Sequence, residues 1–260
     1  MSEQHTSEHK QTESKQFSTA IIVLGLLLAI GMASAAFILG VQAKRAVSGQ
    51  QSITVKGLAE KPIKADSAEW TITIGVTQLT QASALENLAK ERKVVEAFLT
   101  KQGLSYETWS ADVETIGPHY EEVFVKDTPR QVQNGFDAYQ NIRVTSQDLT
   151  KIAAANKAFL QLRAENHPVS AQPPNYLVGN LEAIKMSLIA DATKNARSRA
   201  TEFVKQDGVK VGVMKSASQG AFYILPVGGD AGDDSYGGVY DKSTVNKTAR
   251  VVVTIVYNIE

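Results

Sequence analysis

The stretch AEWTITIGVTQL (68–79) decides the fold. Apolar residues occupy every second position, from Ala68 through Trp70, Ile72 and Ile74 to Val76, and Glu or Thr mostly stands between them. Side chains alternate between the two faces of a β-strand, so this pattern predicts a strand with one buried and one polar face.

A helix is expected directly after this strand, over residues 81–101. Its start has a capping-box signal, Ser83 followed three residues later by Glu86, and Thr80 is the alternative cap. Gly103 supplies a stop signal. The expected apolar stripe consists of Leu85, Leu88, Val95, Phe98 and Leu99.

Further elements follow from the same periodicities. Helices are expected at 148–163, capped by Asp148, and at 181–206. Strands are expected at 52–57, 107–115, 136–145, 175–179, 211–218 and 248–259, with a turn at Asn134-Gly135 and the last strand central and covered on both faces. The order strand–helix–strand–strand occurs twice, at 68–145 and 175–260, so the predicted class is α+β, with helices packed on a mainly antiparallel sheet.

The N-terminal part of the chain predicts a membrane anchor. Residues 20–41 contain no charge and no proline, and about 22 helical residues span roughly 33 Å, enough for a hydrocarbon core. We therefore expect a disordered cytoplasmic tail over 1–17, a transmembrane signal-anchor helix over 18–43 and a linker over 44–51. A cleaved signal peptide is the alternative, because Ala33-Ser34-Ala35 has the small residues of a cleavage site. The expected membrane-spanning residues include Ile21, Leu24, Leu27, Ile30, Phe37 and Val41.

Composition excludes several classes of function. The chain has 27 basic and 27 acidic residues and no basic stripe, so nothing in it predicts binding to nucleic acid. It has no cysteine, which excludes disulfides, thiolate nucleophiles and Cys-ligated metal centres. We find no phosphate-binding or nucleophile-elbow motif and expect neither a cofactor nor an enzymatic activity.

Two histidines and one loop are the remaining candidates for chemistry. His119 and His167 are about fifty residues apart and are expected in surface loops. The Gly/Asp-rich segment 228–238 carries Asp230, Asp233 and Asp234, whose spacing does not fit an EF-hand, so they are weak candidates for calcium. Small residues in the long helix allow close approach of a neighbour, and the candidate oligomer face is Leu188, Ala192, Ala196 and Ala200.

From residue 52 onward, the order of segments resembles the SIMPL-domain family of bacterial envelope proteins. The matching stretches are SITVKGLAE (52–60), ADSAEWTITIGV (65–76), NGFDAYQNIRVTSQDLTKI (134–152), the long helix from 181 and KTARVVVTIVY (247–257). Ala65-Asp66 departs from the Pro-Asp that such proteins often carry there. The resemblance implies an α+β domain over 52–260, export to the periplasm and assembly into rings or other homo-oligomers.

The resemblance implies no catalytic residues, and its link to oxidative or envelope stress is only an expectation. It also implies an orientation, with the N-terminus in the cytoplasm and the domain in the periplasm. The leading hypothesis is therefore a self-assembling scaffold or interaction module whose partners are further copies of the chain and the lipid bilayer. The alternatives are a ligand- or calcium-binding module using the 228–238 loop and an unrecognised hydrolase using His119 with an acidic residue.

Overall fold

The computed structural model describes residues 22–42, 51–125, 128–230 and 238–260. Within them, helices and antiparallel strands are mixed, as the sequence predicted. The expected N-terminal helix spans Ile22–Gln42, with a mean hydropathy of 2.6 and none of it buried. By length and composition it can cross a membrane once. Ile21 and the expected cytoplasmic tail lie outside the described residues.

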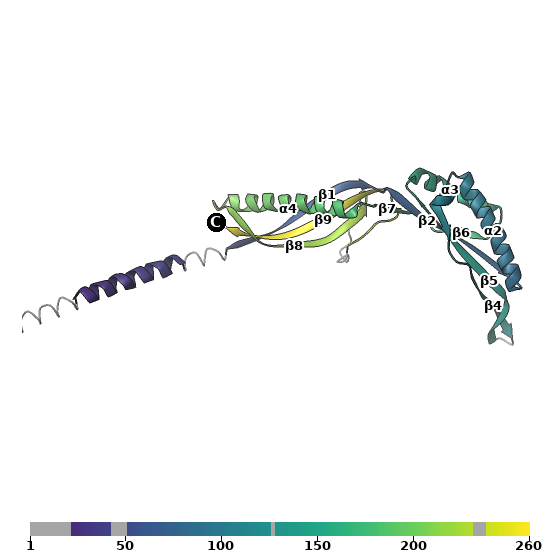
Figure 1. Ribbon diagram of the computed structural model, residues 1–260, viewed down its shortest axis with the longest axis horizontal. Coiled ribbons are helices and arrows are strands. Elements are labelled where there is room, and N and C mark those ends of the chain that lie inside the picture. The colour runs from purple at the N-terminus through teal and green to yellow at the C-terminus, as the bar shows by residue number, and fades with distance from the viewer. Residues whose placement is uncertain (1–21, 43–50, 126–127, 231–237) are drawn as a thin grey trace, which may run out of the picture. The chain divides into compact units, whose positions relative to one another are not determined.

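Six strands form one sheet, which lies entirely within residues 58–195 (Figure 1). Its central path runs β3-β5-β2-β6, with β4 pairing β5 and β7 pairing β2. The strands are β2 (Ser67–Gln78), β3 (Trp109–Ala111), β4 (Thr115–Val125), β5 (Thr128–Ser146), β6 (Val169–Ala171) and β7 (Asn175–Leu177). The predicted alternation of β2 is confirmed, because its five apolar residues from Ala68 to Val76 are at most 5% exposed.

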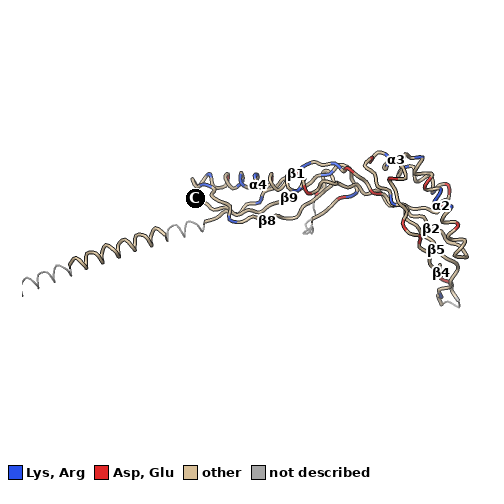
Figure 2. Tube along the Cα trace, viewed as in Figure 1, with Lys and Arg blue, Asp and Glu red and all other residues tan. Residues whose placement is uncertain are grey.

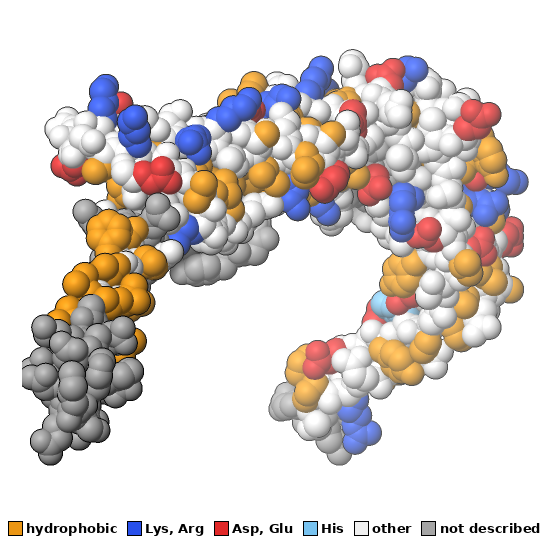
Figure 3. Space-filling model, turned by 60° about the vertical axis from the view of Figure 1, so that its left-hand side comes forward, with side chains coloured by type: hydrophobic (Ala, Val, Ile, Leu, Met, Phe, Trp, Pro, Cys, Tyr) orange, Lys and Arg blue, Asp and Glu red, His pale blue; other side chains and the backbone are white. Residues whose placement is uncertain are grey.

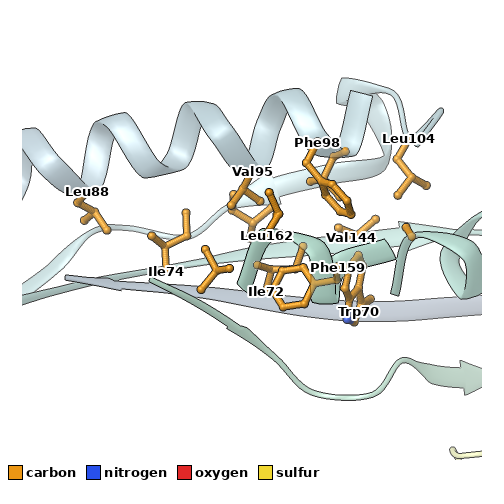
Figure 4. Packing of buried hydrophobic residues seen from close by; sticks show 14 of the residues in the cluster. Trp70, Ile72, Ile74, Leu88, Val95, Phe98, Leu104, Val144, Phe159 and Leu162 are labelled. Atoms are coloured by element: carbon orange, nitrogen blue, oxygen red, sulfur yellow. The ribbon is translucent and has the colours of Figure 1, made fainter. Parts of the chain in front are cut away.

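Two helices cover the apolar face of this sheet, α2 (Gln81–Lys101) and α3 (Leu149–Ala164). Figure 4 shows the apolar side chains of both helices meeting those of β2 and β5. Thr80 caps α2 in a capping box with Ser83, so the predicted alternative cap is the one used. Ala84 is buried in place of the expected Leu85, which is 38% exposed. Asp148 caps α3 as predicted, accepting a hydrogen bond from the Lys151 amide at 3.1 Å.

The predicted turn at Asn134-Gly135 is wrong. Both residues lie inside β5, and β4 and β5 form a long hairpin that joins at 126–127, outside the described residues. The positive φ that Asn-Gly indicates is present, because Gly135 has a φ of 119°. At this position, glycine lets the backbone of Gln78 approach closely, since a Cβ on residue 135 would lie 2.5 Å from the Gln78 carbonyl oxygen.

Three further strands form a second sheet in the order β1-β9-β8, and α4 (Leu181–Lys205) runs along it (Figure 1). The strands are β1 (Ser52–Lys64), β8 (Val211–Pro226) and β9 (Asn246–Ile259). The chain divides into two compact units, and each of these four elements contributes residues to both. The prediction that β9 is central is confirmed, but only alternate residues are fully buried, so its second face is not covered as expected.

The small-residue stripe of α4 belongs to the core of the chain itself. Leu188 is 1% exposed, and Ala192, Ala196 and Ala200 are fully buried. The sequence prediction of an oligomer face at these four residues is therefore wrong. The periodicity correctly identified a packing face, but the structure buries that face inside the chain.

A buried ion pair fixes the entry to β9. The Lys247 side chain is fully buried, with its Nζ 3.2 Å from Asp241 Oδ2 and 2.5 Å from the Asp241 carbonyl oxygen. Burial raises the pKa of the Asp241 carboxyl, but hydrogen bonds from Thr244, Ser243 and Lys247 outweigh it and hold the pKa well below the usual value. Asp241 therefore stays ionised opposite the lysine.

We predict that Lys247→Met lowers the free energy of unfolding by about 3 kcal/mol, because the substitution leaves the Asp241 carboxylate buried without its cation. Urea unfolding of the full chain in detergent, followed by circular dichroism, measures this. Lys242→Met is the control, because Lys242 lies exposed in the same loop. Equal effects of the two substitutions would contradict a structural role for the ion pair.

Candidate functional site

The face of the six-stranded sheet opposite α2 and α3 is polar. Register fixes its residues, because side chains directly opposite each other in an antiparallel pair point to the same face. Thr73 lies opposite Asn141, and Thr77 lies opposite Asp137. The polar face consists of Thr71, Thr73, Gly75 and Thr77 of β2 and Asp137, Tyr139, Asn141 and Arg143 of β5.

At one end of this face, the Asp137 carboxylate lies between side chains of the two neighbouring strands, β2 and β4. The Thr77 hydroxyl on β2 donates to Asp137 Oδ1 at 2.6 Å, and His119 Nδ1 on β4 lies 2.9 Å from Asp137 Oδ2. The His119 and Asp137 side chains are 30% and 20% exposed. We refer to Thr77, His119, Asp137 and Tyr139 as the Asp137 cluster.

Hydrogen bonding sets the charge of this cluster. The bond from Thr77 lowers the pKa of Asp137, burial opposes it, and His119 lowers it further. Burial raises the pKa of the Tyr139 phenol, and the Asp137 carboxylate adds to the increase. Asp137 is therefore an anion and Tyr139 a neutral hydroxyl at neutral pH.

An irregularity in the pairing of β4 with β5 determines the position of the His119 side chain. Gly117 lies opposite Asp137, and the register then shifts between Pro118 and Tyr120. The shift is a β-bulge, which re-aims a side chain. The sequence prediction of a surface loop at His119 is therefore wrong, because the residue lies within β4 and faces a carboxylate.

A shallow cavity of about 480 Å³ opens beside Tyr139. Its lining comes from β2, β5, the end of α3, the loop that follows it and β6: Thr73, Gly75, Tyr139, Arg163, Asn166, His167, Pro168, Val169 and Ser170. His167 Nδ1 lies 2.8 Å from Glu91 Oε2 on α2, which ties the loop before β6 to that helix. The cavity thus offers hydroxyl, amide and guanidinium groups without a closed apolar chamber.

The geometry does not form a nucleophilic triad at either histidine. In such a triad a hydroxyl contacts the imidazole, which in turn contacts the carboxylate. Here the Thr77 hydroxyl bonds the carboxylate instead. Among the described residues, no group of three or more His, Cys, Asp or Glu side chains is placed to hold a metal ion.

Of the three weak candidates for calcium, only Asp230 lies within the described residues. The Asp230 carboxylate is exposed and lies 3.2 Å from Arg250 Nη1. Asp233 and Asp234 lie outside the described residues.

Sequence reasoning missed Thr77, Asp137 and Tyr139, although their period-two spacing with apolar neighbours was the signal that put them on one face.

A second feature is the outer part of the β4–β5 hairpin, which we call the arm: residues 120–124 and 129–133. Its apolar side chains stand in solvent, with Tyr120 at 55%, Val123 at 42%, Phe124 at 69% and Val132 at 46% exposure. Figure 3 shows hydrophobic side chains gathered along this hairpin. Exposed apolar side chains in such a group are typical of a contact surface.

Comparison with known proteins identifies the family. The sequence profile of the SIMPL family, described as a protein of unknown function (DUF541), matches residues 53–257, and the chain belongs to this family. A comparison with curated proteins gives no match.

Solved structures offer only weak likenesses. A hydantoinase/carbamoylase family amidase from Burkholderia ambifaria is 13% identical, covers 44% of this chain and has a TM-score of 0.24. This chain spans only 28% of that amidase. CutA from Synechococcus elongatus PCC7942 is 13% identical over 51% of this chain and 96% of its own, at a TM-score of 0.19. An uncharacterized conserved protein from Listeria innocua is 8% identical over 75% of this chain and 91% of its own, also at 0.19.

We predict that Thr77→Val destabilises the chain by about 1 kcal/mol at pH 7, because it removes a hydrogen bond to an ionised carboxylate. The folded pKa of Asp137 is depressed, so its stabilisation is present above the unfolded pKa and is lost as pH falls through the folded value. The difference in free energy of unfolding between Thr77→Val and the parent chain should therefore shrink below about pH 4. Urea unfolding followed by tryptophan fluorescence measures this difference.

The control for this prediction is Thr73→Val. The Thr73 hydroxyl donates to the Asn141 amide oxygen at 2.8 Å, and neither group titrates in this range. The effect of Thr73→Val on the free energy of unfolding should stay constant with pH. A pH-independent effect of Thr77→Val would contradict the role given to the Asp137 charge.

Proposed function

We propose that this chain is a single-pass membrane protein whose SIMPL domain faces the periplasm, assembles with further copies and acts as a scaffold or interaction module. The arm is the observation that carries this proposal, because it presents four large apolar side chains that are 42–69% exposed. Aromatic residues of this kind dominate the binding energy of protein interfaces.

The N-terminal helix supports the membrane part of the proposal. Its 21 residues correspond to roughly 32 Å, and none of its surface is buried. Leu24, Leu27, Ile30, Phe37 and Val41 are all exposed on it, as expected for side chains that contact lipid. Periplasmic orientation rests on the export that family membership implies.

The proposal assigns no reaction to the domain. A shallow, solvent-open polar face and two separate histidine–carboxylate pairs supply hydrogen bonds and charge without an activated nucleophile. Lys and Arg are interspersed with Asp and Glu along the trace (Figure 2), which supports protein and lipid partners over nucleic acid. A role under oxidative or envelope stress is part of this proposal, and sensitivity of a deletion strain to oxidants tests it.

For the anchor, we predict that Leu27→Arg releases much of the chain from membranes after an alkaline wash, because arginine at a helix centre costs about 2.5–3.5 kcal/mol to insert. Leu160→Arg on α3 is the matched control, since the two leucines are 63% and 64% exposed. Equal retention of both variants would contradict anchoring through this helix. A C-terminal reporter that is active only in the periplasm tests the orientation.

For assembly, we predict that Phe124→Ser shifts the full chain in nanodiscs toward smaller species, because serine removes most of the apolar area that the arm contributes. Light-scattering molar mass measures the shift. Phe203→Ser on α4 is matched in residue type and exposure, at 65% against 69%.

Three outcomes separate the alternatives. Loss of mass in Phe124→Ser alone supports the arm as a contact surface. Loss in Phe203→Ser alone moves the contact to α4. A parent chain that is monomeric at every concentration contradicts self-assembly.

A further inference from the structure

The cavity beside Tyr139 is rich in hydrogen-bond donors and has no acid in its described lining. The lining side chains supply hydroxyl, amide, imidazole and guanidinium groups, but neither Asp nor Glu is among them. Arg163 is exposed, and no ion pair or side-chain hydrogen bond joins its guanidinium to another described residue. An unpaired guanidinium among neutral donors favours an anionic ligand.

The turn that ends α3 fixes one wall of this cavity. The His167 amide donates to the Leu162 carbonyl oxygen, and the Asn166 amide donates to the Arg163 carbonyl oxygen, each at 3.1 Å. Asn166 has a φ of 65°, and these two bonds around a left-handed residue form a Schellman motif. The backbone therefore holds the last turn of the helix and the two residues after it in one defined arrangement.

The His167 ring is oriented by a carboxylate that lies outside the lining. Its Nδ1 is 2.8 Å from Glu91 Oε2. Its Nε2 is 4.0 Å from Glu165 Oε2, which is too long for a hydrogen bond. The second ring nitrogen therefore remains available to a ligand.

Tyr139 forms the opposite wall. It lies directly opposite Gly75 in the pairing of β2 with β5. A Cβ on residue 75 would lie 3.0 and 3.1 Å from two carbons of the Tyr139 ring, so glycine is what lets the ring lean over β2. The Gly75 amide also donates to the Pro168 carbonyl oxygen at 3.0 Å, which joins the two walls. A site held in this way requires little ordering when a ligand binds.

We infer that this cavity binds a sugar acid of monosaccharide size, with its carboxylate on Arg163 and the C–H face of its ring against Tyr139. The volume of about 480 Å³ lies within the range of small-ligand sites. Tyr139 is 47% exposed, so its ring is accessible to a ligand. The inference goes beyond the proposed scaffold or interaction module and does not depend on its self-assembly.

The charge of the lining favours a carboxylate over a phosphate ester. Among the described lining residues, Arg163 is the only one that is a permanent cation. Its planar guanidinium matches the two oxygens of a carboxylate. A phosphate ester carries close to two negative charges at neutral pH, so part of its charge would have no counter-ion here.

The rest of the lining favours a hydroxylated ligand. Thr73, Asn166 and Ser170 offer short polar side chains, and only two of the lining side chains are aliphatic. Sugar hydroxyls both donate and accept hydrogen bonds, as these groups do. The negative face of an aromatic ring suits the slightly positive C–H bonds of a sugar ring. A hydrocarbon acid would instead leave the polar groups of the lining without partners.

Ligand-observed saturation-transfer NMR on the full chain in nanodiscs tests this inference, with empty nanodiscs as the blank. The probes are D-glucuronate, D-galacturonate and N-acetylmuramate, each titrated to about 10 mM. At least one of them should give a saturable signal. D-glucose has the ring of D-glucuronate without the carboxylate and should bind at least about tenfold more weakly.

Matched variants test the assigned residues. Arg163→Gln should weaken binding of the sugar acid at least about tenfold. Lys157→Gln removes an exposed cation from the same helix outside the cavity and should leave binding unchanged. Tyr139→Leu should weaken binding, whereas Tyr139→Phe keeps the ring and should retain most of it. Circular dichroism of each variant checks that the chain remains folded.

The outcomes separate this inference from the proposed function. Saturable binding that requires both the carboxylate and Arg163 supports the sugar-acid site. The inference is overturned if none of the three acids saturates, if D-glucose 6-phosphate binds more tightly than D-glucuronate, or if Arg163→Gln and Lys157→Gln have equal effects. Self-assembly is measured by molar mass, so a failure here leaves that proposal standing.

Discussion

The antiparallel ladder between β2 and β5 is the interaction on which the six-stranded sheet depends. It runs without a break from Ala68 opposite Ser146 to Gln78 opposite Phe136. This register places Trp70, Ile72 and Ile74 beside Val144, Ile142 and Gln140 on one face, where α2 and α3 cover them. A shift by one residue would turn the apolar residues of one strand to the wrong face, so burial of that face fixes the register.

The same register forms the polar face. Once the apolar residues point toward the helices, Thr77, Asp137 and Tyr139 must point away from them. The hairpin extends this sheet into the arm, where neither helix covers the strands, and apolar residues there remain exposed. The polar cluster and the arm are thus two consequences of one pairing pattern, one beside the core and one beyond it.

Local signals in the sequence were sufficient where a single element determined the outcome. The α2 helix has the predicted bounds, Asp148 caps α3, and the alternation of β2 matches its burial. The same local signals gave wrong predictions where a contact with a distant segment of the chain determined the structure. Asn134-Gly135 carries a true preference for positive φ, yet the backbone of Gln78 makes it a bulge inside β5 instead of a turn. The small residues of α4 indicated close packing correctly but could not identify the neighbour, which is the chain itself.

The sequence by itself determined the α+β class, most helix and strand positions and an N-terminal helix long and apolar enough to span a membrane, because each depends on the pattern within about twenty residues. The family followed from the order of many segments along the chain. Only the tertiary structure decided that His119 meets Asp137, that Lys247 is buried against Asp241 and that β8 lies at an edge. These facts depend on strand order and register between segments far apart in the chain. Local propensities do not specify strand order, since many pairings satisfy the same alternation and only the packed core selects one.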